Sequence, residues 1–114
     1  MTNEKQAVID NFSAQANNLE SVIDYQKDSV VSKTIIGKKT GTVTLFAFDK
    51  GQNLSEHTAP YDAIVYSVDG EAQFTVADKV IDVKKGDMII LPANKPHSLE
   101  ATNQYKMLLV MIKS

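Results

Sequence analysis

Two stretches of the sequence, GQNLSEHTAPYDAIVYSVDG at residues 51–70 and GDMIILPANKPH at residues 86–97, carry both histidines of the chain. In each, short runs of Val, Ile, Leu and Tyr alternate with Gly, Pro and Asp, as in short strands joined by turns. The same texture extends from about residue 29 to the end of the chain, in runs such as GTVTLFAF and YKMLLVMI. The pattern predicts an all-β domain, either a barrel or a sandwich.

Turns are expected wherever Gly, Asp or Pro cluster between these runs. The predicted turns lie at residues 37–40, 49–51, 69–70, 85–87 and 92–96. The Asp-Gly pair at 69–70 would therefore separate two strands, AIVYSV and EAQFTV.

The segment before residue 29 has a different pattern. Val8, Ile9 and Phe12 have helical spacing, and Thr2 or Asn3 could cap the helix, so we expect a short amphipathic N-terminal helix. We divide the chain into an N-terminal helical or extended segment, residues 1–28, and a barrel, residues 29–114.

Composition excludes several classes of function. All 12 basic residues are lysines and the net charge is -2, so the arginine forks that read bases and grip phosphates are missing, and we expect no nucleic-acid partner. There is no cysteine, so a bound metal would need nitrogen and oxygen donors. The N-terminus lacks a positive leader before an apolar run, and the longest apolar run, MLLVMI, is far shorter than the ~20 residues of a membrane helix. We therefore expect a cytoplasmic protein without a membrane partner.

The two histidine-containing stretches resemble the two motifs of the cupin superfamily. The first family motif runs from a glycine through His-x-His and a Glu to a second glycine, and Gly51, His57 and Gly70 keep its spacing. In the second, Gly86 and His97 are in register, and only fifteen residues separate the motifs, as in small single-domain microbial cupins of the type 2 conserved-barrel kind. The resemblance covers about residues 30–112 and implies an RmlC-like jelly-roll β-barrel.

The resemblance also implies where a metal would be held. Cupins that carry a metal use two histidines and a glutamate from the first motif and a histidine from the second, and these positions correspond here to His57, Ala59, Ala63 and His97. Alanine supplies no donor, whereas an open transition-metal site normally takes three protein ligands. Asp62 should face away because strand side chains alternate. We therefore expect a degraded site, in which His57 and His97 bind a divalent Ni, Zn, Mn or Fe ion weakly if at all.

Strand alternation in the family's register predicts which side chains line the barrel. They are Ser55, His57, Ala59, Ala63, Val65, Ser67, His97 and Leu99. Tyr61, Asp62 and Lys95 are expected near the mouth. Such small residues leave room for a ligand, so the leading hypothesis is a cupin that binds a small, partly apolar molecule, with His57 and His97 as polar contacts.

Two alternatives stay open. One is a metal-dependent cupin enzyme, an oxygenase or isomerase, that uses the two histidines with water or a further ligand. The other is an inert structural or sensory module. In each case Ile64, Tyr66 and Val68 should face outward with one face of GTVTLFAF, which is more exposed apolar surface than a monomer usually carries. Small cupins commonly pair through such strands, so we expect a homodimer.

Overall fold

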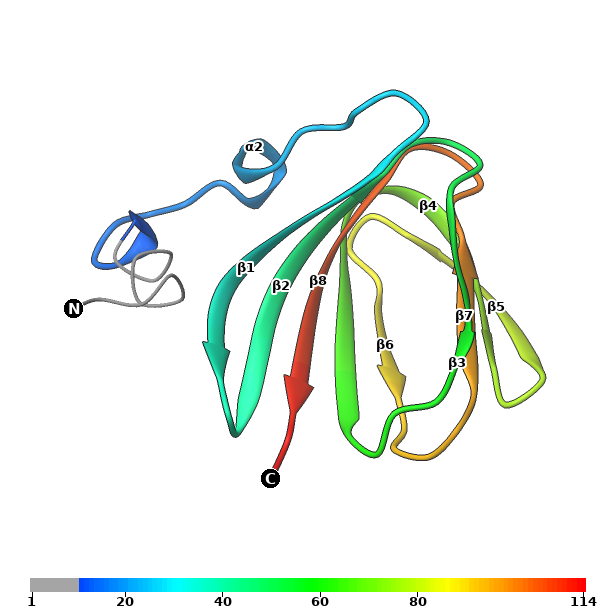
Figure 1. Ribbon diagram of the computed structural model, residues 1–114. Helices are drawn as coiled ribbons and strands as arrows, with labels where there is room; N and C mark the ends of the chain where they lie inside the picture. Colours follow the sequence, from blue (N-terminus) through cyan, green and yellow to red (C-terminus); the bar gives the residue numbers. More distant parts are fainter. Residues whose placement is uncertain (1–10) are drawn as a thin grey trace.

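The computed structural model describes residues 11–114, which form mostly antiparallel strands (Figure 1). The strands are β1 (Val30–Lys38), β2 (Gly41–Phe48), β3 (Asn53–His57), β4 (Asp62–Val76), β5 (Lys79–Lys84), β6 (Met88–Leu91), β7 (His97–Glu100) and β8 (Tyr105–Ile112). The helical turn α2 (Leu19–Val22) precedes them. The strand order is β1-β2-β8-β4-β7-β3, with β5 and β6 each paired to β4, and the sheet curls into a half-barrel (Figure 1). The predicted all-β barrel fold is confirmed.

Strand β4 joins the two halves of this sheet. Its first part pairs with β6 and β8, and its last part, from residue 71 on, pairs with β5 and β7. The register against β8 shifts between Ser67 and Asp69, which marks a β-bulge. A bulge bends a strand and increases its twist without reversing the chain. The turn predicted at Asp69-Gly70 is therefore wrong, because the chain continues there as a single bent strand.

The actual reversal comes later, between β4 and β5. It uses Ala77 and Asp78, whose φ angles are 47° and 69°. Positive φ at both central residues is the requirement of a tight hairpin turn whose twist matches that of the strands. Neither residue is glycine, so the sequence contained no strong marker of this turn.

The bulge in β4 also changes which side chains face the interior. Ala63 and Val65 are buried inside before it, and Phe74 is buried inside after it, although the three do not share one alternation. Val68 is the additional residue and points to the outer face. It was expected to be exposed, but it is only 4% exposed because it packs with Ile23 in a second, outer cluster.

The outer cluster lies beneath a short segment that we call the N-terminal strap, residues 19–25. The strap covers Leu45 and Ala47 of β2, so the expectation that one whole face of GTVTLFAF is exposed is also wrong. Lys33 Nζ donates to the Val22 carbonyl at 2.8 Å, and Lys106 Nζ donates to the Glu20 carbonyl at 2.5 Å. These two lysines thus satisfy carbonyl oxygens that a single helical turn leaves without partners.

Two further polar contacts hold the strap. The Tyr25 hydroxyl donates to Asp69 Oδ2 at 2.6 Å, and Lys85 forms an ion pair with Glu20. Burial and the nearby Asp69 carboxylate raise the pKa of Tyr25, so it remains a donor at neutral pH. The helix predicted from Val8, Ile9 and Phe12 falls mostly on residues outside the described part of the chain, and within that part only residues 11–12 of it are helical. No helix within residues 11–114 is long and apolar enough to cross a membrane.

The substitution Gly70→Ala should destabilise the fold strongly. Gly70 has a φ of 78°, and a Cβ there would lie 1.6 Å from the backbone oxygen of Gln104. Gly51→Ala is the matched control, because its φ is also positive, at 86°, but its Cβ would meet nothing within 4 Å. In the control, the free energy of unfolding should decrease only by the cost of backbone strain, about 1–3 kcal/mol. Urea unfolding measures both variants, and equal losses would contradict the structural role of the bend.

Candidate functional site

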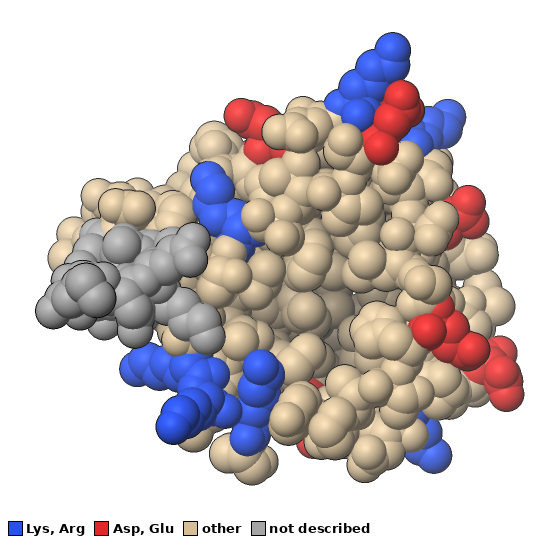
Figure 2. All heavy atoms as spheres, in the orientation of Figure 1, with Lys and Arg blue, Asp and Glu red and all other residues tan. Residues whose placement is uncertain are grey.

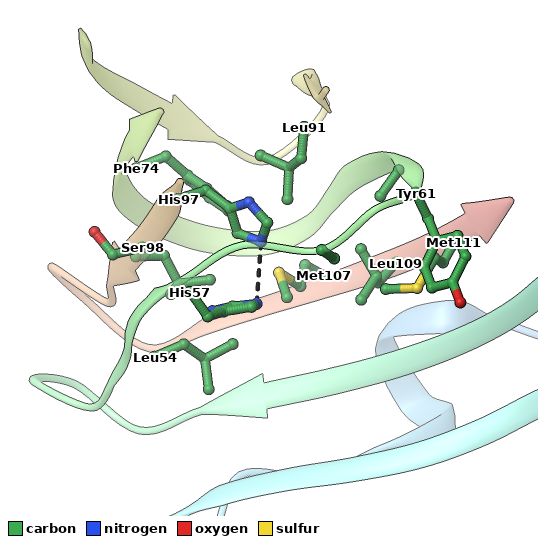
Figure 3. Close-up of a pocket in the computed structure, with 13 residues that line it drawn as sticks. Leu54, His57, Tyr61, Phe74, Leu91, His97, Ser98, Met107, Leu109 and Met111 are labelled. Carbon is green, nitrogen blue, oxygen red and sulfur yellow. Dashed lines mark hydrogen bonds between the residues drawn. The ribbon is translucent and has the colours of Figure 1, made fainter. Parts of the chain in front are cut away.

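An apolar cavity lies inside the half-barrel, between its two halves. Its volume is about 50 Å³, and its wall is mostly aliphatic and aromatic carbon with two imidazoles (Figure 3). The side of the molecule in Figure 2 is hollowed near its centre, where the side chains are uncharged, and charged side chains lie mostly around the margin. A concave, mainly apolar pocket with a few polar groups is the usual form of a small-molecule site.

The two imidazoles meet because β3 and β7 are neighbours. His57 is the last residue of β3, His97 is the first of β7, and the two form a cross-strand pair although they are 40 residues apart. Their Nε2 atoms are 3.0 Å apart, and the rings meet edge to face at 71° (Figure 3). The histidine pair therefore forms one polar contact point on an apolar wall.

A bulge in β3 determines what surrounds His57. The register shifts between the Leu54–Leu99 pair and the His57–His97 pair, with one more residue on β3 than on β7. As a result Leu54 faces the cavity together with His57, while Ser55 is exposed. Ser55 was predicted to line the pocket by simple alternation, and the structure places its side chain outside because the bulge interrupts that alternation.

Both rings are oriented by backbone carbonyls. Nδ1 of His57 lies 3.0 Å from the Ser55 oxygen, and Nδ1 of His97 lies 3.2 Å from the Lys95 oxygen. Each carbonyl belongs to the residue two positions earlier, so both loops hold their histidine in the same way. This arrangement directs both Nε2 atoms toward the cavity, as in histidines that bind metals.

The structure brings five of the eight predicted pocket residues to the cavity. They are His57, Ala59, Ala63, His97 and Leu99. Val65 and Ser67 are fully buried but do not line it. Their partners in register on β8, Leu109 and Met107, have longer side chains and form the wall at this level. The Ser67 hydroxyl instead bonds the Tyr105 hydroxyl at 2.7 Å, and burial raises the pKa of Tyr105 to about 12.

The remaining wall residues were not predicted as pocket residues. They are Leu54, Tyr61, Phe74, Leu91, Ser98, Met107, Leu109 and Met111. Met107, Leu109 and Met111 alternate along YKMLLVMI. The period of two in that run therefore indicated that these three side chains share one face of the strand. Tyr61, expected near the mouth, is 37% exposed.

Two hydrogen bonds join the loops at the mouth. The Asn94 amide donates to the Ala59 carbonyl at 2.8 Å, and the Ala93 amide donates to Asp62 Oδ1, also at 2.8 Å. Asn94 has a φ of 64°, a conformation that Asn tolerates better than most residues. The Asp62 carboxylate is thus held by the loop, and Asp62 is not among the residues that line the cavity beside the histidines.

The cavity residues do not fit an open divalent-metal site. The orientation of the two imidazoles is suitable, but such sites take three protein donors. Within residues 11–114 there is no group of three or more His, Cys, Asp or Glu residues that could hold a metal ion. Ala59 and Ala63, at the other two ligand positions implied by the motif, line the same cavity and contribute only methyl groups.

Comparison with known proteins agrees with this fold. The family model described as "Cupin domain" matches residues 44–113. No match was found among curated proteins. Among solved structures, a conserved protein of unknown function from Streptococcus pyogenes, SPY1581, is 33% identical, with a TM-score of 0.85 and 89% of each chain covered.

Two further structures are similar. A cupin superfamily protein from Desulfitobacterium hafniense is 26% identical, with a TM-score of 0.85, covering 90% of this chain and 94% of that one. A cupin 2 conserved barrel domain protein from Leptotrichia buccalis is 44% identical over 85% of this chain, with a TM-score of 0.82. This chain spans about half of the Leptotrichia protein, since 47% of that chain is covered.

The histidine pair should make stability depend on pH. Burial lowers the pKa of His97 below 6.5, and the neighbouring His57 lowers it further, although the Lys95 carbonyl opposes both effects. As pH falls, His97 is therefore protonated in the unfolded chain before it is protonated in the folded protein. The contribution of His97 to the free energy of unfolding is complete above about pH 6.5 and is lost as pH falls toward the folded-state pKa.

We expect His97→Gln to flatten the pH profile of stability. Urea unfolding of wild type and variant between about pH 7.5 and about pH 5 measures this. The free energy of unfolding of the wild type, relative to that of the variant, should decrease as the pH is lowered across this range. Parallel profiles for the two proteins would show that His97 titrates normally in the folded state.

Proposed function

Because the chain belongs to the cupin family, we propose that its half-barrel binds a small, partly apolar molecule, with His57 and His97 as the polar contacts. The observation that supports this proposal is the histidine pair on the wall of an otherwise apolar cavity. An apolar body would gain from leaving water, and one polar group could bond the imidazoles.

The size of the cavity limits the ligand. A volume of about 50 Å³ corresponds to roughly three to five water molecules. A ligand that is fully enclosed therefore has only a few non-hydrogen atoms. Met107 and Met111 lie in the wall, and methionine adapts its shape readily, so their movement would admit a somewhat larger body.

The two alternatives remain distinct from this proposal. A metal-dependent oxygenase or isomerase is favoured by the orientation of both Nε2 atoms into the cavity, but it needs donors beyond the two imidazoles. An inert module needs no ligand. Titrations with organic molecules and with metal ions separate the three functions.

Methionine methyl NMR provides a direct test of ligand binding. Small neutral alcohols, ketones and amides should shift the Met107 and Met111 signals, because both side chains line the cavity. Met88, which is 58% exposed outside the cavity, is the control within the same molecule. Ala63→Leu should fill the cavity and abolish the shifts, whereas Ala16→Leu, at an exposed position, should not.

Three results would contradict the proposal. Shifts in Met88 as large as those in the cavity would indicate surface binding. Shifts caused only by nickel, zinc or manganese would favour the metal-dependent alternative. An absence of response to any compound or ion would favour the inert module.

We also propose that the protein forms a homodimer through an outer band on the sheet. The band consists of Ile36, Val43, Ile64, Tyr66, Met88, Ile90 and Val110. Register pairs connect Ile36 to Val43, Val43 to Val110, Val110 to Ile64, and Ile64 to Ile90, so the band crosses five strands. Ile64, Tyr66 and Ile90 are 39%, 41% and 54% exposed. An uncharged apolar band can pair with itself about a two-fold axis, since no charge needs an opposite partner.

Tyr66→Lys should convert this dimer to monomer. A lysine ammonium buried without a partner in an apolar interface costs several kcal/mol. Val80→Lys is the matched control, because Val80 is 60% exposed on β5, away from the band. Light scattering after size-exclusion chromatography reports the masses, and a wild type that is monomeric at high concentration would refute the proposal.

A further inference from the structure

The protons available to the histidine pair can be counted. A backbone carbonyl oxygen only accepts hydrogen bonds, so the contacts of His57 Nδ1 with Ser55 and of His97 Nδ1 with Lys95 each need an N–H on the ring. The contact between the two Nε2 atoms, at 3.0 Å, needs a third. Two neutral imidazoles carry only one N–H each. The three contacts therefore lack one proton.

The backbone contacts determine where the proton is missing. If both Nδ1 atoms keep their hydrogen bonds, both Nε2 atoms are unprotonated, and two acceptor atoms lie 3.0 Å apart without a proton between them. Moving one proton from Nδ1 to Nε2 would allow a hydrogen bond between the two rings, but one backbone carbonyl would lose its donor. The histidine pair thus presents hydrogen-bond acceptors to the cavity. A ligand that carries a hydrogen-bond donor would supply the missing proton.

We propose that the polar group recognised here is a hydroxyl, so that the ligand is a small apolar alcohol and not a carboxylic acid. This inference rests on the proposed function and names the class of molecule that the pocket takes. A hydroxyl brings the missing proton to an Nε2 atom and leaves both backbone hydrogen bonds intact. A carboxylate brings only acceptors and a negative charge, which would face the lone pairs in an apolar cavity.

The wall of the cavity argues against an ammonium group, the other common donor. Among residues 11–114, no Asp or Glu lines the wall, so a buried ammonium would have no opposite charge from this part of the chain in the wall. Burying an unpaired charge costs much more than burying a hydroxyl that is hydrogen-bonded. The apolar wall, including Leu54, Leu91 and Leu109, instead suits a short hydrocarbon body.

The test compares n-butanol, diethyl ether and butyrate on chelator-treated protein, at about pH 8 where ordinary histidines are neutral. The alcohol and the ether are isomers that differ in the presence of a hydrogen-bond donor. The Met107 and Met111 methyl signals report dissociation constants. We expect n-butanol to bind about tenfold more tightly than the ether, as one additional hydrogen bond allows, and butyrate to bind most weakly.

A variant and a spectrum test the cause of this preference. His97→Phe removes one acceptor but keeps a planar ring, so it should bring alcohol and ether closer in affinity. In the free wild type, nitrogen-15 shifts of the imidazoles should show the Nδ1–H form in both rings. An Nε2–H in either ring of the free protein at this pH would overturn the inference.

The possible failures are distinguishable. If alcohol and ether bind the wild type equally, the pocket function stands and the hydroxyl inference is wrong. If butyrate binds most tightly, the polar end is a donor and the inference is wrong. If none of the three compounds shifts the cavity methionines, the inference and the proposed pocket function both fail.

Discussion

The bend in β4 is the constraint on which the rest of the structure depends. One strand can belong to both halves of the sheet only if it bulges at Ser67–Asp69 and passes Gln104 without a side chain at Gly70. Because four other strands pair with β4, this bend sets the angle between the two halves. The cavity lies between those halves, so its existence follows from the backbone at Gly70.

Regular alternation within strands could be predicted from the sequence, but its interruptions could not. The strand runs and the position of both histidines follow from a period of two and from the spacing of two motifs. The two errors at Ser55 and Val68 have different origins. Ser55 lies at a bulge where the alternation shifts by one, whereas Val68 faces outward as alternation predicts and is buried because the N-terminal strap covers it. Asp69-Gly70 did mark a special backbone, but the same residues suit a turn and a bulge. The burial of Val68 also required a contact with Ile23, which is distant in sequence.

The histidine pair shows how two imidazoles can be oriented by the backbone alone. Ala59 and Ala63 leave space where the resemblance to metal-binding cupins would place a histidine and a glutamate. The carbonyls that aim His57 and His97 belong to the backbone, so they do not depend on the identity of those side chains. The two imidazoles are therefore directed into a cavity whose wall is mostly apolar and, within residues 11–114, has no third His, Cys, Asp or Glu donor for a divalent ion.

The N-terminal strap has a consequence for the order of folding. Its bond from Tyr25 to Asp69 spans 44 residues, and its contact with Lys106 spans 86. During synthesis from the N-terminus, the strap leaves the ribosome long before β8, which carries Lys106, is available. These two contacts cannot form before β4 and β8 have been synthesised. Docking of the strap can therefore begin on β2, through Leu45 and Ala47, but it is complete only when β8 is present.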